Sequence, residues 1–414
     1  MNAVTLTSSF PATVQPGIPK LCETPPGWIR APLGQFLHEV RRPIKMEDDE
    51  TYKLVTVKRA RGGVVDRGSF LGRDVLVKSQ FKIESGDFLI SKRQIVHGAC
   101  GLVPNHLAGS IVSNEYAVLN GNDAIDTTFL NYLAHSVFFQ QTCFHSSIGV
   151  HVEKMIFKLD RWLKFDFNLP PLPEQRKIAD ILSTWDAAIE KTEALLATAR
   201  TQKRALMQQL LTGKRRFPEF EGQPWQEVRL GDVVKLSKSR LDPRKPHNAR
   251  PCIELEHIEA ESGRLLGSVS SDELKSIKAE FRPGDILFGK LRPYLRKYLA
   301  PDFEGVCSTE IWVLCADTAH LRSDYLHCIV QSDGFITEAE KSAGSKMPRS
   351  DWNVVAEYVV SLPNVDEQER IAVAISTCDQ EVDQLSQNIT KLRTEKKALM
   401  QQLLTGKRRV VLDA

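Results

Sequence analysis

The twelve-residue stretch ALMQQLLTGKRR occurs twice in this chain, at residues 205–216 and again at 398–409. Both copies lie within a longer gapless match between residues 174–217 and 367–410, in which 22 of 44 positions are identical. The offset between the two segments is 193 residues throughout. A match at one fixed offset indicates an internal repeat, and the repeat decides the fold.

Shorter echoes at nearly the same offset lie outside these segments. Trp28 and Trp225 are each followed five residues later by Leu-Gly, and Gly-Asp occurs at 86–87 and 284–285. Ser-Asn-Glu at 113–115 is echoed by Ser-Thr-Glu at 308–310, and Leu-Pro precedes each repeat segment. We therefore predict the order globular unit, long helix, globular unit, long helix.

Each repeat segment carries an apolar heptad seam that is typical of a coiled-coil helix of about 39 residues. One Lys stands at the same seam position in each copy. A core helix of a bundle is the ordinary alternative, but the chain offers little other helical material for packing. Each helix leads from one globular unit to the other, so we predict an antiparallel pair that returns the C-terminus to the N-terminal unit. The seam positions are Ile178, Leu182, Trp185, Ile189, Thr192, Leu196, Ala199, Lys203, Leu206 and Leu210, then Ile371, Ile375, Cys378, Val382, Leu385, Ile389, Leu392, Lys396, Leu399 and Leu403.

The globular units contain short β-branched runs separated by Gly, Pro, Asn and Asp, which predict strands and turns. We expect strands near 53–57, 88–90, 116–119, 285–288 and 311–314, and helices near 126–139 and 323–332. The fold class is therefore α+β, with two pseudo-twofold-related α+β domains separated by the helix pair. The expected boundaries are an N-terminal extension at 1–25, domains at 26–173 and 217–366, and helices at 174–216 and 367–414, the last including a short tail.

Composition places the chain among globular proteins. It has 414 residues, of which 42% are hydrophobic and 26% charged, and its net charge is only +3. Residues 1–19 lack the basic region of a signal peptide, so we expect a cytoplasmic protein without a membrane anchor. The eight cysteines include no CxxC pair, which favours buried, reduced thiols over a zinc or redox site.

No catalytic constellation is found. The segment Leu-Thr-Gly-Lys at 211–214 lacks the flanking residues of a phosphate-binding loop, no amino-methylation motif occurs, and the histidines stand singly. We therefore predict no catalytic residue, no metal site and no cofactor bound by this chain.

Basic residues cluster in corresponding parts of both halves. Arg and Lys in loops suit phosphate binding and the recognition of guanine edges, which favours DNA. An ordinary solvated surface is the alternative for any single cluster. The candidate DNA-binding residues are Arg59, Arg61, Arg67, Lys92 and Arg93 in the first unit and Lys238, Arg240, Arg244, Lys245, Lys290, Arg292, Lys346 and Arg349 in the second.

Polar residues recur unchanged in the twelve-residue identity, although stability places little demand on an exposed surface. Recent duplication is one explanation. The other is that one kind of partner subunit docks twice and needs the same surface at both helix ends. The candidate docking residues are Gln208, Gln209, Arg215 and Arg216, with their counterparts Gln401, Gln402, Arg408 and Arg409.

This plan resembles the specificity subunit of type I restriction-modification systems over essentially the whole chain. The resemblance rests on the helix entries LPPLPEQ at 169–175 and LPNVDEQ at 362–368, and on GDILFGKLRPY at 284–294. It implies a non-catalytic subunit that recognises an asymmetric bipartite site in double-stranded DNA. It also implies two methyltransferase subunits and restriction subunits as partners, with S-adenosylmethionine, ATP and Mg used by the assembled complex.

Two other functions stay open at this point. One is a nuclease or methyltransferase with unrecognised motifs. The other is a structural coiled-coil adaptor, or a module that binds RNA or protein without selecting a DNA sequence.

Overall fold

The computed structural model describes residues 11, 13–341 and 347–412, which form two compact units. Unit 1 comprises residues 1–191 and 390–414, and unit 2 comprises residues 192–389. Each of the two long helices is divided between the units, with one part in unit 1 and the other part in unit 2.

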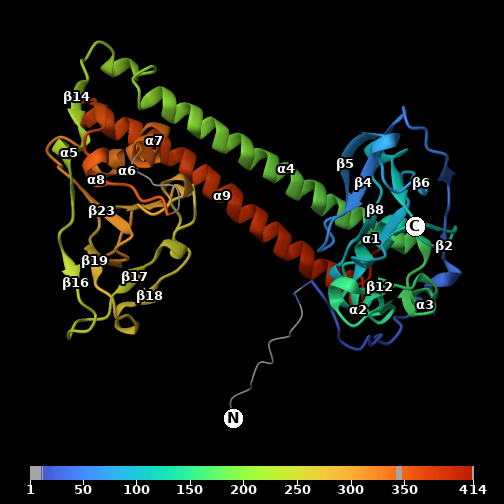
Figure 1. Cartoon of the computed structure of the whole chain (residues 1–414). Helices are drawn as coiled ribbons and strands as arrows, with labels where there is room; N and C mark the ends of the chain where they lie inside the picture. The colour runs from blue at the N-terminus through green and yellow to red at the C-terminus, as the bar shows by residue number, and fades with distance from the viewer. Residues whose placement is uncertain (1–10, 12, 342–346, 413–414) are drawn as a thin grey trace. The chain divides into compact units, whose positions relative to one another are not determined.

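Unit 1 contains two main sheets (Figure 1). One has four antiparallel strands in the order β2 (Leu37–Glu39), β10 (Tyr116–Gly121), β7 (Phe88–Ser91) and β8 (Cys100–Leu102). The other has the order β3 (Pro43–Ile44), β6 (Gln80–Lys82), β9 (Ile111–Ser113), β4 (Thr51–Val57) and β5 (Val64–Leu71), with β4 and β9 parallel. Two short pairs join β1 (Ile29–Pro32) to β13 (Asp166–Leu169) and β11 (Ser147–Ile148) to β12 (Ile156–Phe157). The short helices are α1 (Thr127–Leu133), α2 (Val137–His145) and α3 (Leu159–Trp162).

Unit 2 repeats this topology. Its four-stranded sheet has the order β15 (Val234–Leu236), β23 (Ile311–Ala316), β20 (Ile286–Gly289) and β21 (Tyr298–Leu299). Its five-stranded sheet has the order β16 (Arg240–Leu241), β19 (Lys278–Phe281), β22 (Gly305–Cys307), β17 (Pro251–Ile253) and β18 (Val269–Ser270), with β17 and β22 parallel. The pair β14 (Gln226–Arg229) and β24 (Val359–Leu362) matches β1 and β13, and the short helices are α5 (Leu230–Val233), α6 (Ser323–Gln331), α7 (Asp333–Lys341) and α8 (Trp352–Val355). The predicted strands and the α+β class are therefore confirmed.

The long helices are α4 (Leu172–Leu210) and α9 (Val365–Leu403), each of 39 residues. Every predicted seam position is buried or partly buried. Both helices end three residues before a glycine with a φ of +67°, Gly213 and Gly406, which suits the left-handed conformation that follows many helices. Within unit 1, Glu174 and Asp186 contact Arg409 and Lys396 respectively, so the two chain directions are opposed. The antiparallel pair and the return of the C-terminus to the first unit are confirmed.

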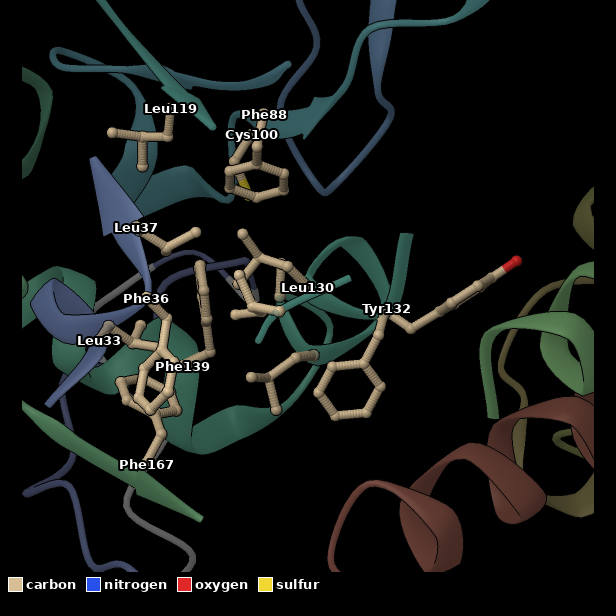
Figure 2. Close-up of a cluster of buried hydrophobic side chains, with 14 of the residues drawn as sticks. Leu33, Phe36, Leu37, Phe88, Cys100, Leu119, Leu130, Tyr132, Phe139 and Phe167 are labelled. Carbon is tan, nitrogen blue, oxygen red and sulfur yellow. The ribbon is translucent and has the colours of Figure 1, made fainter. Parts of the chain in front are cut away.

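The main core of unit 1 joins sheet, short helices and long helices. Figure 2 shows Phe88, Leu130, Phe139 and Phe167 among its buried side chains. The same cluster contains Ile178 of α4 and Leu403 of α9, so part of each seam packs on the globular domain and not only on the other helix. Unit 2 repeats this arrangement with Met207, Leu210, Ile371 and Ile375.

The helical region expected near 126–139 is confirmed and contains two helices, because Ser136 accepts a hydrogen bond from the amide of Phe139 and starts α2 there. One expectation needs correction. Cys22 is exposed, whereas the other seven cysteines are buried or partly buried, and all eight are free thiols. Cys22 belongs to the N-terminal extension, which Asn168 holds against unit 1 by hydrogen bonds to the carbonyls of Cys22 and Glu23.

Candidate nucleic-acid interface and helix junctions

Four of the five candidate residues of unit 1, Arg59, Arg61, Lys92 and Arg93, lie in two neighbouring loops. Arg59 and Arg61 occupy the turn between β4 and β5, where Ala60 and Arg61 both have a positive φ, at 57° and 60°. The amides of Ala60 and Arg61 donate to the carbonyls of His97 and Gly98, at 2.7 and 2.9 Å, which ties this turn to the loop after β7. Non-glycine residues in this conformation are strained, so the surrounding contacts must hold the turn in place.

Acidic and imidazole groups surround the same turn. Glu153 accepts from Arg59, with Nη2 2.7 Å from Oε2, and its other oxygen lies 3.1 Å from His97 Nε2. Burial lowers the pKa of His97, and the charge of Arg59 lowers it further. His97 is therefore neutral at pH 7, and Arg59 carries the positive charge of this cluster.

Lys92 and Arg93 begin the loop after β7. The amide of Lys92 donates to the Glu115 carbonyl at 2.9 Å, and the Lys92 carbonyl accepts from the amide of Phe157 at 2.8 Å. Arg93 donates two hydrogen bonds to the Glu115 carboxylate, from Nε at 2.5 Å and from Nη2 at 3.3 Å. We call this backbone arrangement of Lys92, Glu115 and Phe157 the ledge of unit 1.

Unit 2 has the same ledge, built from Lys290, Glu310 and Ser350. The amide of Lys290 donates to the Glu310 carbonyl at 3.0 Å, and the amide of Ser350 donates to the Lys290 carbonyl at 2.9 Å. The Glu310 carboxylate again accepts from an arginine, but here it is Arg349, with Nε 2.9 Å from Oε2. In both units, an equivalent glutamate therefore accepts a hydrogen bond from an arginine. The two arginines come from different segments of the chain.

Arg292 belongs to the ledge of unit 2. Its amide donates to the Pro348 carbonyl at 2.7 Å, Leu291 forms a β-bridge with Arg349, and its φ is 56°. The structure thus brings Arg349 together with Lys290 and Arg292, which lie in a distant segment of the sequence. Lys346, the fourth candidate of this region, lies outside the described residues.

The remaining candidates lie on other strands. Arg67 is exposed on β5, and Lys238, Arg240, Arg244 and Lys245 are exposed on and around β16. Arg244 is held by Asp242 at 2.8 and 2.9 Å, and Arg240 donates to the carbonyls of Ser237 and Ser239. These contacts are local to the segment after β15, and among the described residues none joins it to the ledge of unit 2.

The candidate docking residues divide into two groups. Gln208, Gln209 and Arg215, with Gln401, Gln402 and Arg408, are exposed at the ends of α4 and α9. Arg216 and Arg409 instead make intramolecular ion pairs. Arg216 contacts Glu367 at 2.9 and 2.6 Å, and Arg409 contacts Glu174 at 2.7 and 2.8 Å.

Each of these ion pairs is completed by a tryptophan. Trp225 Nε1 donates to Glu367 Oε2 at 3.0 Å, and Trp28 Nε1 donates to Glu174 Oε2 at 3.2 Å. The guanidinium carbons lie 5.5 and 5.9 Å from the centres of the same indole rings. We call each set of glutamate, arginine and tryptophan an end junction.

The end junctions explain residues that the sequence repeat left without a role. Glu and Gln open both helix entries, Trp28 matches Trp225, and the identity ends in Lys-Arg-Arg. Gln175 and Gln368 act beside the glutamates by donating to the carbonyls of Pro170 and Pro363, at 2.9 and 3.0 Å. The shared offset marks these motifs as one set, although it does not show that they touch. The ion pairs give Arg216 and Arg409 a structural reason to recur, besides docking or duplication.

In the described residues, no group of three or more His, Cys, Asp or Glu is arranged to hold a metal ion. No helix in that part of the chain is long and apolar enough to cross a membrane.

Comparison with known proteins is consistent with this repeated architecture. The model of the type I restriction modification DNA specificity domain matches twice, at residues 34–198 and 222–393. The chain belongs to this family. The MjaVIII specificity subunit of Methanocaldococcus jannaschii is 22% identical over 424 residues, covering 93% of this chain and 94% of the relative. The EcoDI specificity subunit of Escherichia coli is 24% identical over 273 residues, covering 57% and 60%.

Solved structures share the fold. The S subunit of a type I restriction-modification system from M. genitalium has a TM-score of 0.57 and 15% identity, covering 94% of this chain and 99% of that one. A chain from a structural study of type I system assembly and conformational transition has a TM-score of 0.57 and 19% identity, covering 94% and 100%. The resemblance seen in the sequence is confirmed, and the chain is a specificity subunit, the non-catalytic component of such systems.

Proposed function

We propose that this specificity subunit recognises an asymmetric bipartite sequence in double-stranded DNA, with one half-site for each unit. The observation that carries the proposal is the ledge, which recurs at Lys92 and Lys290 with the same backbone hydrogen bonds. The arginines on the two ledges occupy different positions in the sequence. Arg93 follows Lys92 directly, whereas Arg349 belongs to a segment distant from Lys290. Shared scaffolds with different side chains favour two different half-sites. Half-site centres on one face of B-DNA lie about 10 to 10.5 base pairs apart, so a few central base pairs go unread.

The partners follow from the same symmetry. Two methyltransferase subunits dock on the equivalent exposed surfaces at the ends of α4 and α9, and restriction subunits join that complex. The methyltransferase subunits supply S-adenosylmethionine chemistry, and the restriction subunits use ATP with Mg. This chain selects the DNA sequence and positions its partner subunits on it.

Methylome mapping of the host with and without the gene for this chain tests the proposal. We expect one asymmetric bipartite methylation motif that disappears on deletion and returns on complementation. A palindromic or continuous motif that depends on this chain contradicts the bipartite mechanism. The absence of any chain-dependent motif favours the adaptor function instead, and would be checked by RNA and DNA binding of the assembled complex.

A further inference from the structure

The interior of the helix pair contains a lysine in each unit, and both are largely buried. Lys203 of α4 is 11% exposed and pairs with Asp379 of α9, and Lys396 of α9 is 17% exposed and pairs with Asp186 of α4. Both lysines and both aspartates correspond at the repeat offset. Their neighbours along the seam are mostly Leu, Ile and Val, so a charged residue here needs a specific role.

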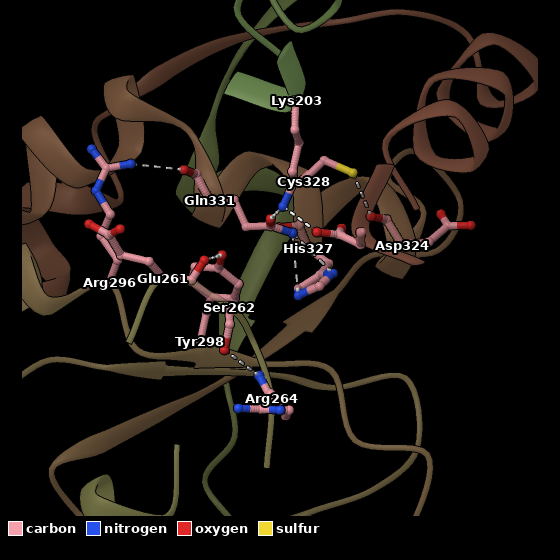
Figure 3. A network of polar contacts seen from close by, with 11 residues as sticks. Lys203, Glu261, Ser262, Arg264, Arg296, Tyr298, Asp324, His327, Cys328 and Gln331 are labelled. Carbon is pink, nitrogen blue, oxygen red and sulfur yellow. Dashed lines mark hydrogen bonds and ion pairs between the residues drawn. The ribbon is translucent and has the colours of Figure 1, made fainter. Parts of the chain in front are cut away.

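A third residue joins each ion pair to the globular domain of its own unit. In unit 2, Lys203 Nζ donates to Gln331 Oε1 of α6 at 2.6 Å, and Figure 3 shows Lys203 pointing from α4 toward Gln331. Gln331 is 6% exposed and donates in turn to the His327 carbonyl at 3.1 Å. The lysine therefore links both long helices to the end of α6.

Unit 1 makes the same link with a different residue. Tyr132 of α1 donates to Asp186 Oδ2 at 2.7 Å and lies 3.1 Å from Ser183 Oγ. The Lys396 ammonium lies 5.3 Å from the centre of the Tyr132 ring, a cation–π contact. We call the sets Lys203, Asp379, Gln331 and Lys396, Asp186, Tyr132 the mid-helix networks.

Stability alone does not explain these networks. A buried ion pair is often no more stabilising than apolar side chains of similar size, because both charges lose their hydration. The best-attested use of such a pair is to specify one arrangement among several. We infer that the arrangement specified here is the position of a globular domain on the two long helices.

Two contacts at separate points along the helix can fix this position. In each unit the glutamate of the end junction and the aspartate of the mid-helix network are 12 residues apart on one helix, about 18 Å at 1.5 Å per residue. Each domain also packs on both helices through its core, at residues such as Ile178 and Leu403 in unit 1. That apolar packing is non-directional, whereas the polar network adds a second, directional contact further along the helix. One base pair of DNA is about 3.4 Å long, so a small pivot would change which spacer fits.

We propose that the mid-helix networks determine the spacer length of the target, by fixing the orientation of each recognition domain on the helix pair. Gln331 and Tyr132 are on this view positioning residues, which contact no DNA themselves. The inference rests on the proposed bipartite recognition and adds the residues that set the distance between half-sites.

The test uses the complete complex with its methyltransferase subunits and a panel of duplexes. All duplexes carry the wild-type half-sites, with the spacer shortened by one base pair, unchanged, or lengthened by one. The double variant Tyr132→Phe with Gln331→Leu removes the hydrogen bonds that join the helix ion pairs to the domains. It leaves both ion pairs in place, together with the cation–π contact of Lys396 with the ring at position 132. The matched control is Thr184→Ala with Thr377→Ala, which removes a helix hydrogen bond at equivalent places in both copies without a link to either domain.

We expect the double variant to stay folded and to keep both half-sites, while its preference for the wild-type spacer falls on the order of tenfold, the effect of losing a hydrogen bond to a charged group. Gln331→Glu, which keeps an acceptor for Lys203, should retain the wild-type preference, and the threonine control should too. An unchanged spacer preference overturns the inference. Loss of folding, or altered bases within a half-site, also overturns it, because the networks would then stabilise the fold or shape the base contacts. A wild-type complex with no bipartite preference overturns the proposed function itself.

Discussion

Arg216 and Glu367 are 151 residues apart in sequence and form a bidentate ion pair, with Nη2 2.6 Å from Oε2 and Nε 2.9 Å from Oε1. The Glu367 side chain is fully buried and that of Arg216 is 17% exposed. The same contact recurs between Arg409 and Glu174 in unit 1, but there the arginine is 42% exposed. The pair joins the end of one long helix to the start of the other within each unit.

The difference in exposure predicts unequal costs. Arg216→Ala leaves a buried carboxylate without its cation, which should lower the free energy of unfolding by about 3 to 5 kcal/mol. Arg409→Ala should cost less, because water reaches the more open site beside Glu174. Urea denaturation of the full chain measures both losses.

A paired replacement separates the ion pair from the charge that is left behind. Arg216→Met with Glu367→Leu should recover most of the stability lost in Arg216→Ala, because no unpaired charge stays buried. Equal losses for Arg216→Ala and Arg409→Ala would show that the exposure of the arginine does not set the cost. No recovery in the paired variant would show that the unpaired buried carboxylate is not the source of the loss.

The sequence predicted the helix pair better than its attachments. Heptad spacing places Leu182 and Ile375 on the seam because burial depends on a local period, and the structure confirms it. Contacts such as that between Glu310 and Arg349 join segments whose separation follows no period. The repeat offset pairs Glu174 with Glu367 and Arg216 with Arg409, but it does not predict that Glu174 contacts Arg409.

The ledge arginines are the sharpest test of DNA recognition. Arg349→Ala should weaken binding by about 1 to 3 kcal/mol and relax one base position if the guanidinium contacts a base edge. Lys290→Ala should weaken all sequences alike and reduce the salt slope by about one unit if the ammonium contacts phosphate. Binding of randomised duplexes at several salt concentrations separates the two effects.

A control for this experiment lies elsewhere in unit 2. Lys275 is an exposed lysine outside the candidate set, so Lys275→Ala removes one positive charge without changing a candidate residue. If Arg349→Ala, Lys290→Ala and Arg292→Ala all behave like this control, the ledge is not part of the DNA interface.

Partly buried histidines predict a loss of stability in acid. Burial lowers the pKa of His135 and of His327 to about 4, below the ordinary value of 6.5. Between these values the unfolded chain binds protons that the folded chain does not, so stability should fall as the pH drops from about 6.5 toward 4. The free energy of unfolding at about pH 7.5 and pH 5.5 measures this slope.

Replacement of the histidines identifies the source of the slope. The variant His135→Gln with His327→Gln should lose less stability between the two pH values than the wild-type chain does. His151→Gln, at an exposed position, is the control and should keep the wild-type slope. A double variant with an unchanged slope would assign the acid sensitivity to other groups.

Partner docking is tested best at the residues that the end junctions leave exposed. Reversal of Arg216 or Arg409 would break an ion pair within this chain, so a lost partner would have two explanations. Arg215 and Arg408 are exposed next to Arg216 and Arg409. Arg215 follows the end of α4, and Arg408 follows the end of α9. Arg215→Glu with Gln208→Ala and Gln209→Ala should therefore remove one methyltransferase subunit and leave the fold intact.

The equivalent changes at Gln401, Gln402 and Arg408 should remove the other subunit, and the two sets combined should remove both. Native mass spectrometry of the reconstituted complex counts the subunits, and Lys191→Glu, an exposed position on α4 outside the twelve-residue identity, is the control. The two sets of candidate docking residues correspond at the repeat offset, so each set of changes should act without the other. A combined variant that still carries two methyltransferase subunits would show that the identity has another origin, such as recent duplication.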